Sequence, residues 1–189
     1  MKVYVIRHGE SENNLSQKWT GWGNAHLTEK GREEARIAGS IIEGICFNKV
    51  FTSDLARAME TAEEALPNVP YENSPLLREI HVGELSGNPI SCVEPEKRLL
   101  LHEHGFAEFG GEQRTEFNQR IETFLHSLES LNCDTVAVFA HRGVLLGLLD
   151  AVLGTVISRK HICCYNCTVA VFEYVNETWR LHSWINPER

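Results

Sequence analysis

Short apolar segments of strand length alternate along this chain with longer segments of helical periodicity, and this alternation limits the folds that the chain can adopt. The strand-like segments are KVYVI (2–6), KVFTS (49–53) and DTVAVFA (134–140). Polar residues follow each of them, and then a segment in which apolar residues recur every three or four positions. Such a rhythm is typical of parallel strands whose connecting helices cover both faces of the sheet. We therefore predict an α/β fold, a three-layer α/β/α sandwich with a mostly parallel central sheet.

Four helices are predicted from the spacing of apolar residues. The first begins after Thr28, a typical N-cap residue, and the second begins at Asp54 and stops at Pro67. The third follows Glu112, and its apolar residues alternate in steps of three and four, the most regular spacing in the chain. These residues are Phe117, Ile121, Phe124, Leu128 and Leu131. The fourth is the apolar segment 142–154.

The C-terminal part of the chain has the pattern of a β-hairpin. Two strand-like segments, 168–175 and 179–185, are expected to form a hairpin across Asn176 and Glu177. No repeat, linker or low-complexity stretch interrupts the sequence, and 189 residues are enough to bury one core. We therefore expect a single domain over residues 1–189.

Charge and hydropathy exclude several classes of partner. The net charge of -8 argues against nucleic acid and anionic membranes, because both select basic surfaces. No stretch approaches the ~20 apolar residues of a membrane span, and the opening apolar run is shorter than that of a signal peptide. We expect a cytoplasmic protein whose cysteines are reduced thiols. No sequence feature indicates an oligomeric state.

Arginine and histidine side chains follow each of the three predicted strands. Arg7 and His8 follow the first, Arg57 lies shortly after the second, and His141 and Arg142 follow the third. Because ligands in such folds bind beyond the carboxyl ends of the strands, we expect these side chains to meet at one edge of the sheet. Guanidinium groups grip phosphoryl oxygens in pairs, and an imidazole can donate a hydrogen bond or attack phosphorus. The sequence therefore predicts a phosphate site.

Five blocks of the sequence carry a family resemblance. In chain order they are RHGESENN (7–14), TGWGNAHLTEKG (20–31), SDLARAMETAE (53–63), LREIHVGELSG (77–87) and AHRG (140–143). The tripeptide RHG alone would be weak evidence for a family. Five blocks in this order, however, resemble the signatures of the histidine phosphatase superfamily, in its phosphoglycerate-mutase-like branch. The resemblance implies a phosphoglycerate-mutase-like fold.

The same resemblance implies roles for the residues of the phosphate pocket. His8 would be the nucleophile that becomes phosphohistidine, with Arg7 beside it. Arg57, His141 and Asn14 would complete the pocket. Since these groups neutralise the phosphate, no metal and no cofactor is expected.

Further roles concern the leaving group and the rest of the substrate. Glu79 matches the general acid that protonates the departing alcohol and then activates water. Glu84 and His81 lie close in sequence and are rival acids. Thr20 and Gly21 match a pair that contacts the substrate.

Departures from the family pattern bear on the reaction. Mutases usually carry arginine where Ile80 stands and a lysine shortly downstream, and they use paired arginines in the following insert, where residues 88–111 contain only Arg98. Fewer cations favour water as the acceptor, so we expect a phosphomonoester hydrolase for small phosphorylated metabolites. A phosphoglycerate mutase is the alternative, and a non-catalytic phospholigand sensor a third. Arg142 replaces the usual glycine and could narrow the pocket or contact phosphate.

Three other groups of residues in the sequence are not part of the predicted phosphate site. HICCYNC (161–167) contains CxxC and a histidine, but it lacks the spacing of four zinc ligands, so a reduced cysteine cluster is expected. His102 and His104 are expected to be exposed helix or loop residues. Trp19 and Trp22 could equally line the pocket mouth or pack the loop.

Overall fold

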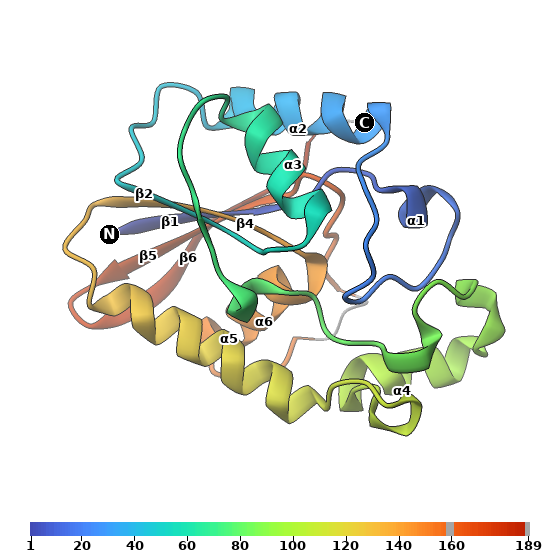
Figure 1. Ribbon diagram of the computed structural model, residues 1–189. Helices are drawn as coiled ribbons and strands as arrows, with labels where there is room; N and C mark the ends of the chain where they lie inside the picture. Colours follow the sequence, from blue (N-terminus) through green and yellow to red (C-terminus); the bar gives the residue numbers. More distant parts are fainter. Residues whose placement is uncertain (158–160, 188–189) are drawn as a thin grey trace.

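A central sheet positions the functional residues. The computed structural model describes residues 1–157 and 161–187, and in these residues six strands form one sheet in the order β3-β2-β4-β1-β5-β6 (Figure 1). The strands are β1 (Lys2–Arg7), β2 (Lys49–Thr52), β3 (Glu72–Asn73), β4 (Thr135–Ala140), β5 (Val169–Val175) and β6 (Thr178–Ile185). The first four pair in parallel, whereas β5 and β6 are antiparallel to their neighbours. The predicted mostly parallel sheet is confirmed.

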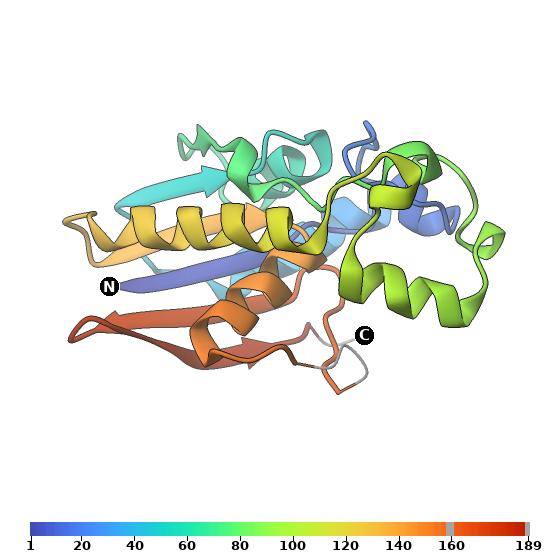
Figure 2. The same cartoon turned by 90° about the horizontal axis from the view of Figure 1, so that it is seen from below.

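Two pairs of helices cover the two faces of this sheet. Helices α2 (Glu29–Ile41) and α3 (Ala56–Ala65) lie on one face, and α5 (Arg114–Glu129) and α6 (Arg142–Leu153) lie on the other (Figures 1 and 2). Side chains of β1 alternate between two apolar cores, as the period of a strand requires. Val5 packs in the α5/α6 core, whereas Ile6 packs in the α2/α3 core. The three-layer sandwich is therefore confirmed.

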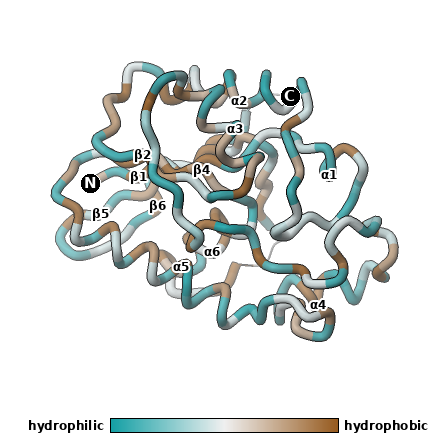
Figure 3. Tube along the Cα trace, in the orientation of Figure 1, coloured by the Kyte–Doolittle hydropathy of each residue, from teal (hydrophilic) through white to brown (hydrophobic). Residues whose placement is uncertain are grey.

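Most of the smaller elements lie beyond the carboxyl ends of the parallel strands, whereas the 3₁₀ helix that follows β3 packs beside α5 (Figures 1 and 2). The smaller elements are the helices α1 (Glu12–Leu15) and α4 (Pro95–His104) and the 3₁₀ helices η1 (Pro75–Leu77), η2 (Gly83–Leu85), η3 (Ile90–Cys92) and η4 (Ala107–Phe109). Hydrophobic and hydrophilic residues alternate along α2 and α5, as expected for helices with one face on a sheet (Figure 3). No helix among the described residues is both long and apolar enough to cross a membrane.

The boundaries of two elements have clear physical causes. The helix predicted from Asp54 begins at Ala56 instead, because the carboxylate of Asp54 accepts a hydrogen bond from Arg78 Nε at 2.7 Å and Leu55 is extended. The predicted hairpin is confirmed. Its two turn residues, Asn176 and Glu177, have φ angles of 51° and 59°, as a two-residue turn between twisted strands requires.

Candidate active site

Three strand ends lie side by side at one edge of the sheet. Arg7 at the end of β1 pairs with Ala140 of β4, and Thr52 of β2 pairs with Phe139 of β4. The chain segments that follow these strands therefore enter the same region. A cavity of about 520 Å³ opens there. Of the residues singled out from the sequence, Arg7, His8, Asn14, Thr20, Gly21, Arg57, Glu79 and Arg142 line it.

The His8 ring is held in one orientation by its two nitrogen atoms. Its Nδ1 lies 2.7 Å from the carbonyl oxygen of Gly9, and its Nε2 lies 3.3 Å from Arg57 Nε. Because a carbonyl oxygen only accepts, Nδ1 carries the proton and Nε2 keeps its lone pair. Burial holds the pKa of His8 well below its usual value, and the charges of Arg57 and Arg7 lower it further. The ring is therefore neutral, and its Nε2 carries a lone pair that accepts a hydrogen bond from Arg57 Nε.

Arg57 is placed before any substrate arrives. Its side chain is 1% exposed, and it donates to the carbonyl oxygens of Gly21 at 2.8 Å and Gly23 at 3.2 Å. Burial lowers the pKa of Arg57 to about 10, with Glu79 acting in the opposite direction, so the guanidinium stays charged at neutral pH. Gly21 has a φ of +48°, and a Cβ there would lie 2.7 Å from a methyl carbon of Val82. Gly21 therefore serves the cavity through its backbone.

Arg7 brings a second guanidinium to the cavity. It donates to the carbonyl oxygen of Cys164 at 2.7 Å. Its Nε is buried and has no hydrogen-bond partner within residues 1–157 and 161–187. Burial lowers the pKa of Arg7 as well. A guanidinium with an unused donor is the kind of group that binds anions.

His141 and Asn14 occupy less direct positions. His141 is fully buried behind the residues that line the cavity, with its ring centre 5.2 Å from that of His8 and its Nε2 2.8 Å from Ser53 Oγ. Burial, followed by the charge of Arg57, holds the pKa of His141 well below its usual value. Asn14 lines the cavity, but its Oδ1 accepts hydrogen bonds from Ser11 N and Asn166 Nδ2. Only its amide NH₂ group can serve an anion.

Glu79 is the one candidate acid that lines the cavity. Its Oε1 accepts from the backbone N–H of Ile80 at 2.9 Å, and its Oε2 accepts from that of Gly143 at 3.1 Å. A Cβ atom at Gly143 would lie 2.0 Å from Glu79 Oε1, so only glycine leaves room for the carboxyl group. Glu84 is exposed, and His81 packs edge-on against the ring of Trp22.

The rest of the cavity lining, which we call its outer part, contains residues that sequence reasoning did not place there. Lys18, Arg98 and Arg114 add cations. The sequence argument counted Arg98 but neither Lys18 nor Arg114, so the cavity contains more cations than that argument assumed. The apolar lining residues are Trp19, Ile80, Val82, Ile90, Pro95, Leu99, Phe106 and Leu146. A signal was present in the sequence, because Arg98 follows Pro95 by three residues, the spacing of one helix face, and proline is favoured at the first position of a helix.

Two expectations for aromatic and imidazole side chains are now resolved. The expectation that His102 is exposed is wrong, because it lies in the cavity wall with its ring centre 5.8 Å from that of Trp19. His104 is exposed, as expected. Trp19 lines the cavity, whereas Trp22 packs the loop and donates its indole N–H to the carbonyl oxygen of Glu79 at 2.7 Å.

The HICCYNC segment supports the site through its backbone. Cys164 and Cys167 are buried, and burial raises the pKa of both thiols. The carbonyl oxygen of Cys164 accepts from Arg7, and Asn166 Nδ2 donates to the carbonyl oxygen of His8 at 3.0 Å. Among the described residues, no three His, Cys, Asp or Glu side chains form a group that could hold a metal ion.

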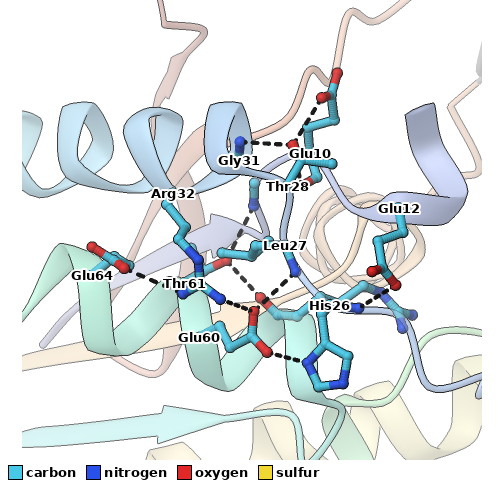
Figure 4. A network of polar contacts seen from close by, with 12 residues as sticks. Glu10, Glu12, His26, Leu27, Thr28, Gly31, Arg32, Glu60, Thr61 and Glu64 are labelled. Atoms are coloured by element: carbon cyan, nitrogen blue, oxygen red, sulfur yellow. Dashed lines mark hydrogen bonds and ion pairs between the residues drawn. The ribbon is translucent and has the colours of Figure 1, made fainter.

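A polar network fastens the loop before α2 to helix α3, which carries Arg57 (Figure 4). The carboxylate of Glu60 accepts from the backbone N–H of Leu27 at 2.9 Å and from Arg32 at 3.1 Å, and it also pairs with the His26 ring. The loop whose carbonyl groups hold Arg57 is thus tied to the helix on which Arg57 stands.

Glu10 of the RHGE sequence serves this network (Figure 4). Its Oε1 accepts from Thr28 Oγ1 at 2.9 Å. The backbones cross here so closely that a Cβ at Gly9 would lie 2.2 Å from the carbonyl oxygen of Gly31. The N–H of Gly9 donates to Thr61 Oγ1 at 3.1 Å. Gly9 therefore allows a close crossing of backbones next to the His8 ring.

Comparison with known proteins places these features in context. The family model described as "Histidine phosphatase superfamily (branch 1)" matches residues 3–187. A protein of Photorhabdus laumondii named "Probable phosphoglycerate mutase GpmB" is 28% identical over 197 residues, which cover 98% of this chain and 90% of that protein. The structure of YhfR from Bacillus stearothermophilus has a TM-score of 0.84 at 28% identity and covers 96% of this chain and 95% of its own. A putative alpha-ribazole-5'-P phosphatase from Escherichia coli has a TM-score of 0.82 at 24% identity, covering 96% and 94%, and shows likeness of fold alone.

Proposed function

The chain belongs to branch 1 of the histidine phosphatase superfamily, and on this premise we propose that it hydrolyses phosphomonoesters of small metabolites through a phosphohistidine on His8. The observation that carries the proposal is the state of the His8 ring. Its Nδ1–H is bound to the carbonyl oxygen of Gly9, so Nε2 carries the lone pair, which accepts a hydrogen bond from Arg57 Nε at the cavity. An imidazole held in this tautomer is a nucleophile for phosphorus.

In the first step, the phosphoryl group of the ester binds to the guanidinium groups of Arg7 and Arg57. Nε2 of His8 attacks phosphorus, so that a P–N bond forms while the ester P–O bond breaks. The departing alkoxide takes a proton from the carboxyl group of Glu79. The two arginines balance the negative charge that is spread over the phosphoryl oxygens during transfer. Asn14, which lines the cavity, and His141, which packs against His8, complete the phosphate pocket in this proposal.

In the second step, water attacks the phosphohistidine. Glu79, now a carboxylate, takes a proton from this water, the P–N bond breaks, and inorganic phosphate leaves. The neutral ring of His8 and the protonated Glu79 are restored, so that protons and bonds balance over the cycle. No metal ion takes part in either step.

The alcohol part of the substrate would contact the outer part of the cavity. The apolar side chains of Leu99 and Phe106 lie there on the segment between β3 and α5, and that of Trp19 lies there on the loop between α1 and α2. Thr20 lines the cavity close to Gly21, whose carbonyl holds Arg57. We therefore expect an alcohol group with apolar surface to bind more tightly than a fully polar one.

A specific observation favours a second candidate, a phosphoglycerate mutase. Lys18, Arg98 and Arg114 line the cavity in addition to the cations expected from the sequence, and they could retain a substrate with a second anionic group. The Photorhabdus relative carries this activity in its name. A phospholigand sensor is the third possibility, although a sensor would not need the acid Glu79.

One set of assays separates the three functions. Labelled phosphomonoester is mixed with the protein and quenched in base, and the label should be found as acid-labile phosphate on His8. Phosphate release should be detected across a panel of phosphorylated metabolites, and His8→Ala should abolish it. Interconversion of phosphoglycerates that depends on a bisphosphate primer and exceeds phosphate release would favour the mutase. Label on a serine or cysteine would refute the proposal, and binding without any label would indicate a sensor.

A further inference from the structure

We propose that the ion pair between Arg120 and Glu112 is the element that positions Glu79 for proton donation. The inference rests on the proposed function, because it takes Glu79 as the acid. Arg120 lies on α5 and Glu112 lies just before that helix, so neither follows a strand end. Both side chains are largely buried. Among the residues that the structure describes, neither Arg120 nor Glu112 is part of the cavity lining, so their effect on the reaction would be indirect.

The segment that carries Glu79 depends on side chains for its backbone hydrogen bonds. Residues 78–82 lie between η1 and η2 and belong to no helix or strand. Buried backbone carbonyl groups without a ladder or helix partner need donors from elsewhere. Arg120 supplies them, because it donates to the carbonyl oxygens of Leu76 at 2.8 Å and Arg78 at 2.7 Å, and to that of Glu79 itself at 2.9 Å.

Glu112 fixes both the arginine and the far side of the segment. Its two carboxylate oxygens accept from Arg120 Nε at 2.7 Å and from Arg120 Nη2 at 2.9 Å. Its Oε2 also accepts from the backbone N–H of His81 at 3.1 Å, and its own backbone N–H donates to the carbonyl oxygen of His81 at 2.8 Å. The pair therefore holds the chain on both sides of Glu79.

The guanidinium of Arg120 uses all of its donors in this arrangement. It has five N–H groups in a rigid planar fork, and five acceptors surround it. Its face also lies over the ring of Phe117, with 4.5 Å from the guanidinium carbon to the ring centre. Lysine has three donors on a flexible stem and cannot reproduce these contacts.

The position of the Glu79 carboxyl group depends on the peptide group between Glu79 and Ile80. Its carbonyl oxygen accepts from both Arg120 and Trp22, and this fixes the orientation of the peptide group between Glu79 and Ile80. The N–H of that same peptide group donates to Glu79 Oε1 at 2.9 Å. A rotation of this peptide group would therefore move the carboxyl group away from the substrate's leaving oxygen.

The test uses two variants and a matched structural control. Arg120→Lys keeps the charge but loses the fork, and Glu112→Gln keeps one carbonyl acceptor but loses the bidentate pair. Leu128→Ala removes a buried side chain near the C-terminal end of the same helix α5, eight residues beyond Arg120, and should destabilise the fold. Single-turnover rates of His8 phosphorylation are measured with an alkyl phosphate and with p-nitrophenyl phosphate, whose leaving group needs little protonation.

We expect Arg120→Lys and Glu112→Gln to lower the alkyl rate at least about tenfold more than the p-nitrophenyl rate, because a misplaced acid matters only for a basic leaving group. Leu128→Ala should leave the ratio of the two rates unchanged. In a Glu79→Gln background, Arg120→Lys should not change the ratio further, since both substitutions remove the same function.

Equal slowing of both substrates by Arg120→Lys and Glu112→Gln would overturn the inference, and so would an additive change of the ratio in the double variant. If Arg120→Lys does not fold, Glu112→Gln decides alone. Failure of the proposed function gives a different result, because the wild-type protein would then form no phosphohistidine with either substrate.

Discussion

Replacing Gly143 by alanine should displace the carboxyl group of Glu79 while the side chains of Arg7, His8 and Arg57 stay in place. The added Cβ would lie 2.0 Å from Glu79 Oε1 and 3.1 Å from its Cδ. Carbon and oxygen atoms approach to only about 3.3 Å even in their closest favourable contacts, so the carboxyl group must move by more than about 1 Å. A misplacement of this size costs on the order of a hundredfold in rate when the group acts in the transition state.

The fold should tolerate this substitution. Gly143 is the second residue of α6, and it is not among the residues with positive φ. Alanine has a higher helix propensity than glycine by about 1 kcal/mol, which offsets part of the steric cost. Gly147→Ala is a matched control one turn along the same helix, because its Cβ would lie 3.1 Å from the Phe117 ring and does not contact Glu79.

The assay is the single-turnover phosphorylation of His8, followed by rapid quenching in base. With an alkyl phosphate, Gly143→Ala should be slower than the wild-type protein by about a hundredfold, whereas with p-nitrophenyl phosphate the loss should be about tenfold or less. Gly147→Ala should keep the wild-type ratio of the two rates. An unchanged alkyl rate in Gly143→Ala, or an equal loss with both substrates, would refute the reasoning that places Glu79 as the acid.

Three further predictions concern the acid, the absence of a metal requirement, and pH. Glu79→Gln should slow the phosphorylation of His8 by an alkyl phosphate about a hundredfold more than by p-nitrophenyl phosphate. Glu84 is exposed, and Glu84→Gln should slow both reactions equally. A selective loss of the alkyl rate in Glu84→Gln would mean that Glu84, and not Glu79, is the acid. Activity should survive EDTA unchanged, and loss that magnesium or zinc restores would contradict charge balance by arginine alone. Burial holds the pKa values of His8 and His141 well below the usual range, so the unfolded chain takes up protons that the folded chain does not. The free energy of unfolding should therefore fall as the pH drops through about 6.5, and denaturant titrations should show a shallower fall in His141→Gln; equal slopes would contradict the assignment.

The sequence predicted the part of the site that stands on the sheet. Arg7, His8 and His141 follow strands that run in the same direction, so the topology alone brings them to one edge. The alternation of strand and helix patterns was enough to predict that topology. Glu79 could be selected only through the family resemblance, because a carboxylate in a loop has no pattern of its own.

The contacts around Glu79 could not be predicted. Gly143 acts through a backbone N–H and through the absence of a side chain, and neither leaves a mark in composition or spacing. Arg120 stands in a helix where an arginine is ordinarily a surface residue, and its five acceptors include three carbonyl groups of a segment about forty residues earlier in the chain. Arg98 and His102 could not be placed at the cavity from the sequence, because the spacing of residues predicts no helix in the segment 88–111, which carries them on α4.

The two parts of the cavity come from different parts of the chain, and this has an evolutionary consequence. The half that contains Arg7 and His8 stands on strand ends that the whole sheet holds in register, so substitutions there are constrained by the fold. Much of the outer part comes from one contiguous segment of the chain, which includes η3 and α4 and carries Ile90, Leu99 and Phe106. Such a segment can accumulate substitutions, gain insertions or be exchanged between relatives without changing the register of any strand. Divergence of substrate preference within this lineage, and its redesign by transplanting one stretch of sequence, should therefore be concentrated between Asn88 and Phe106.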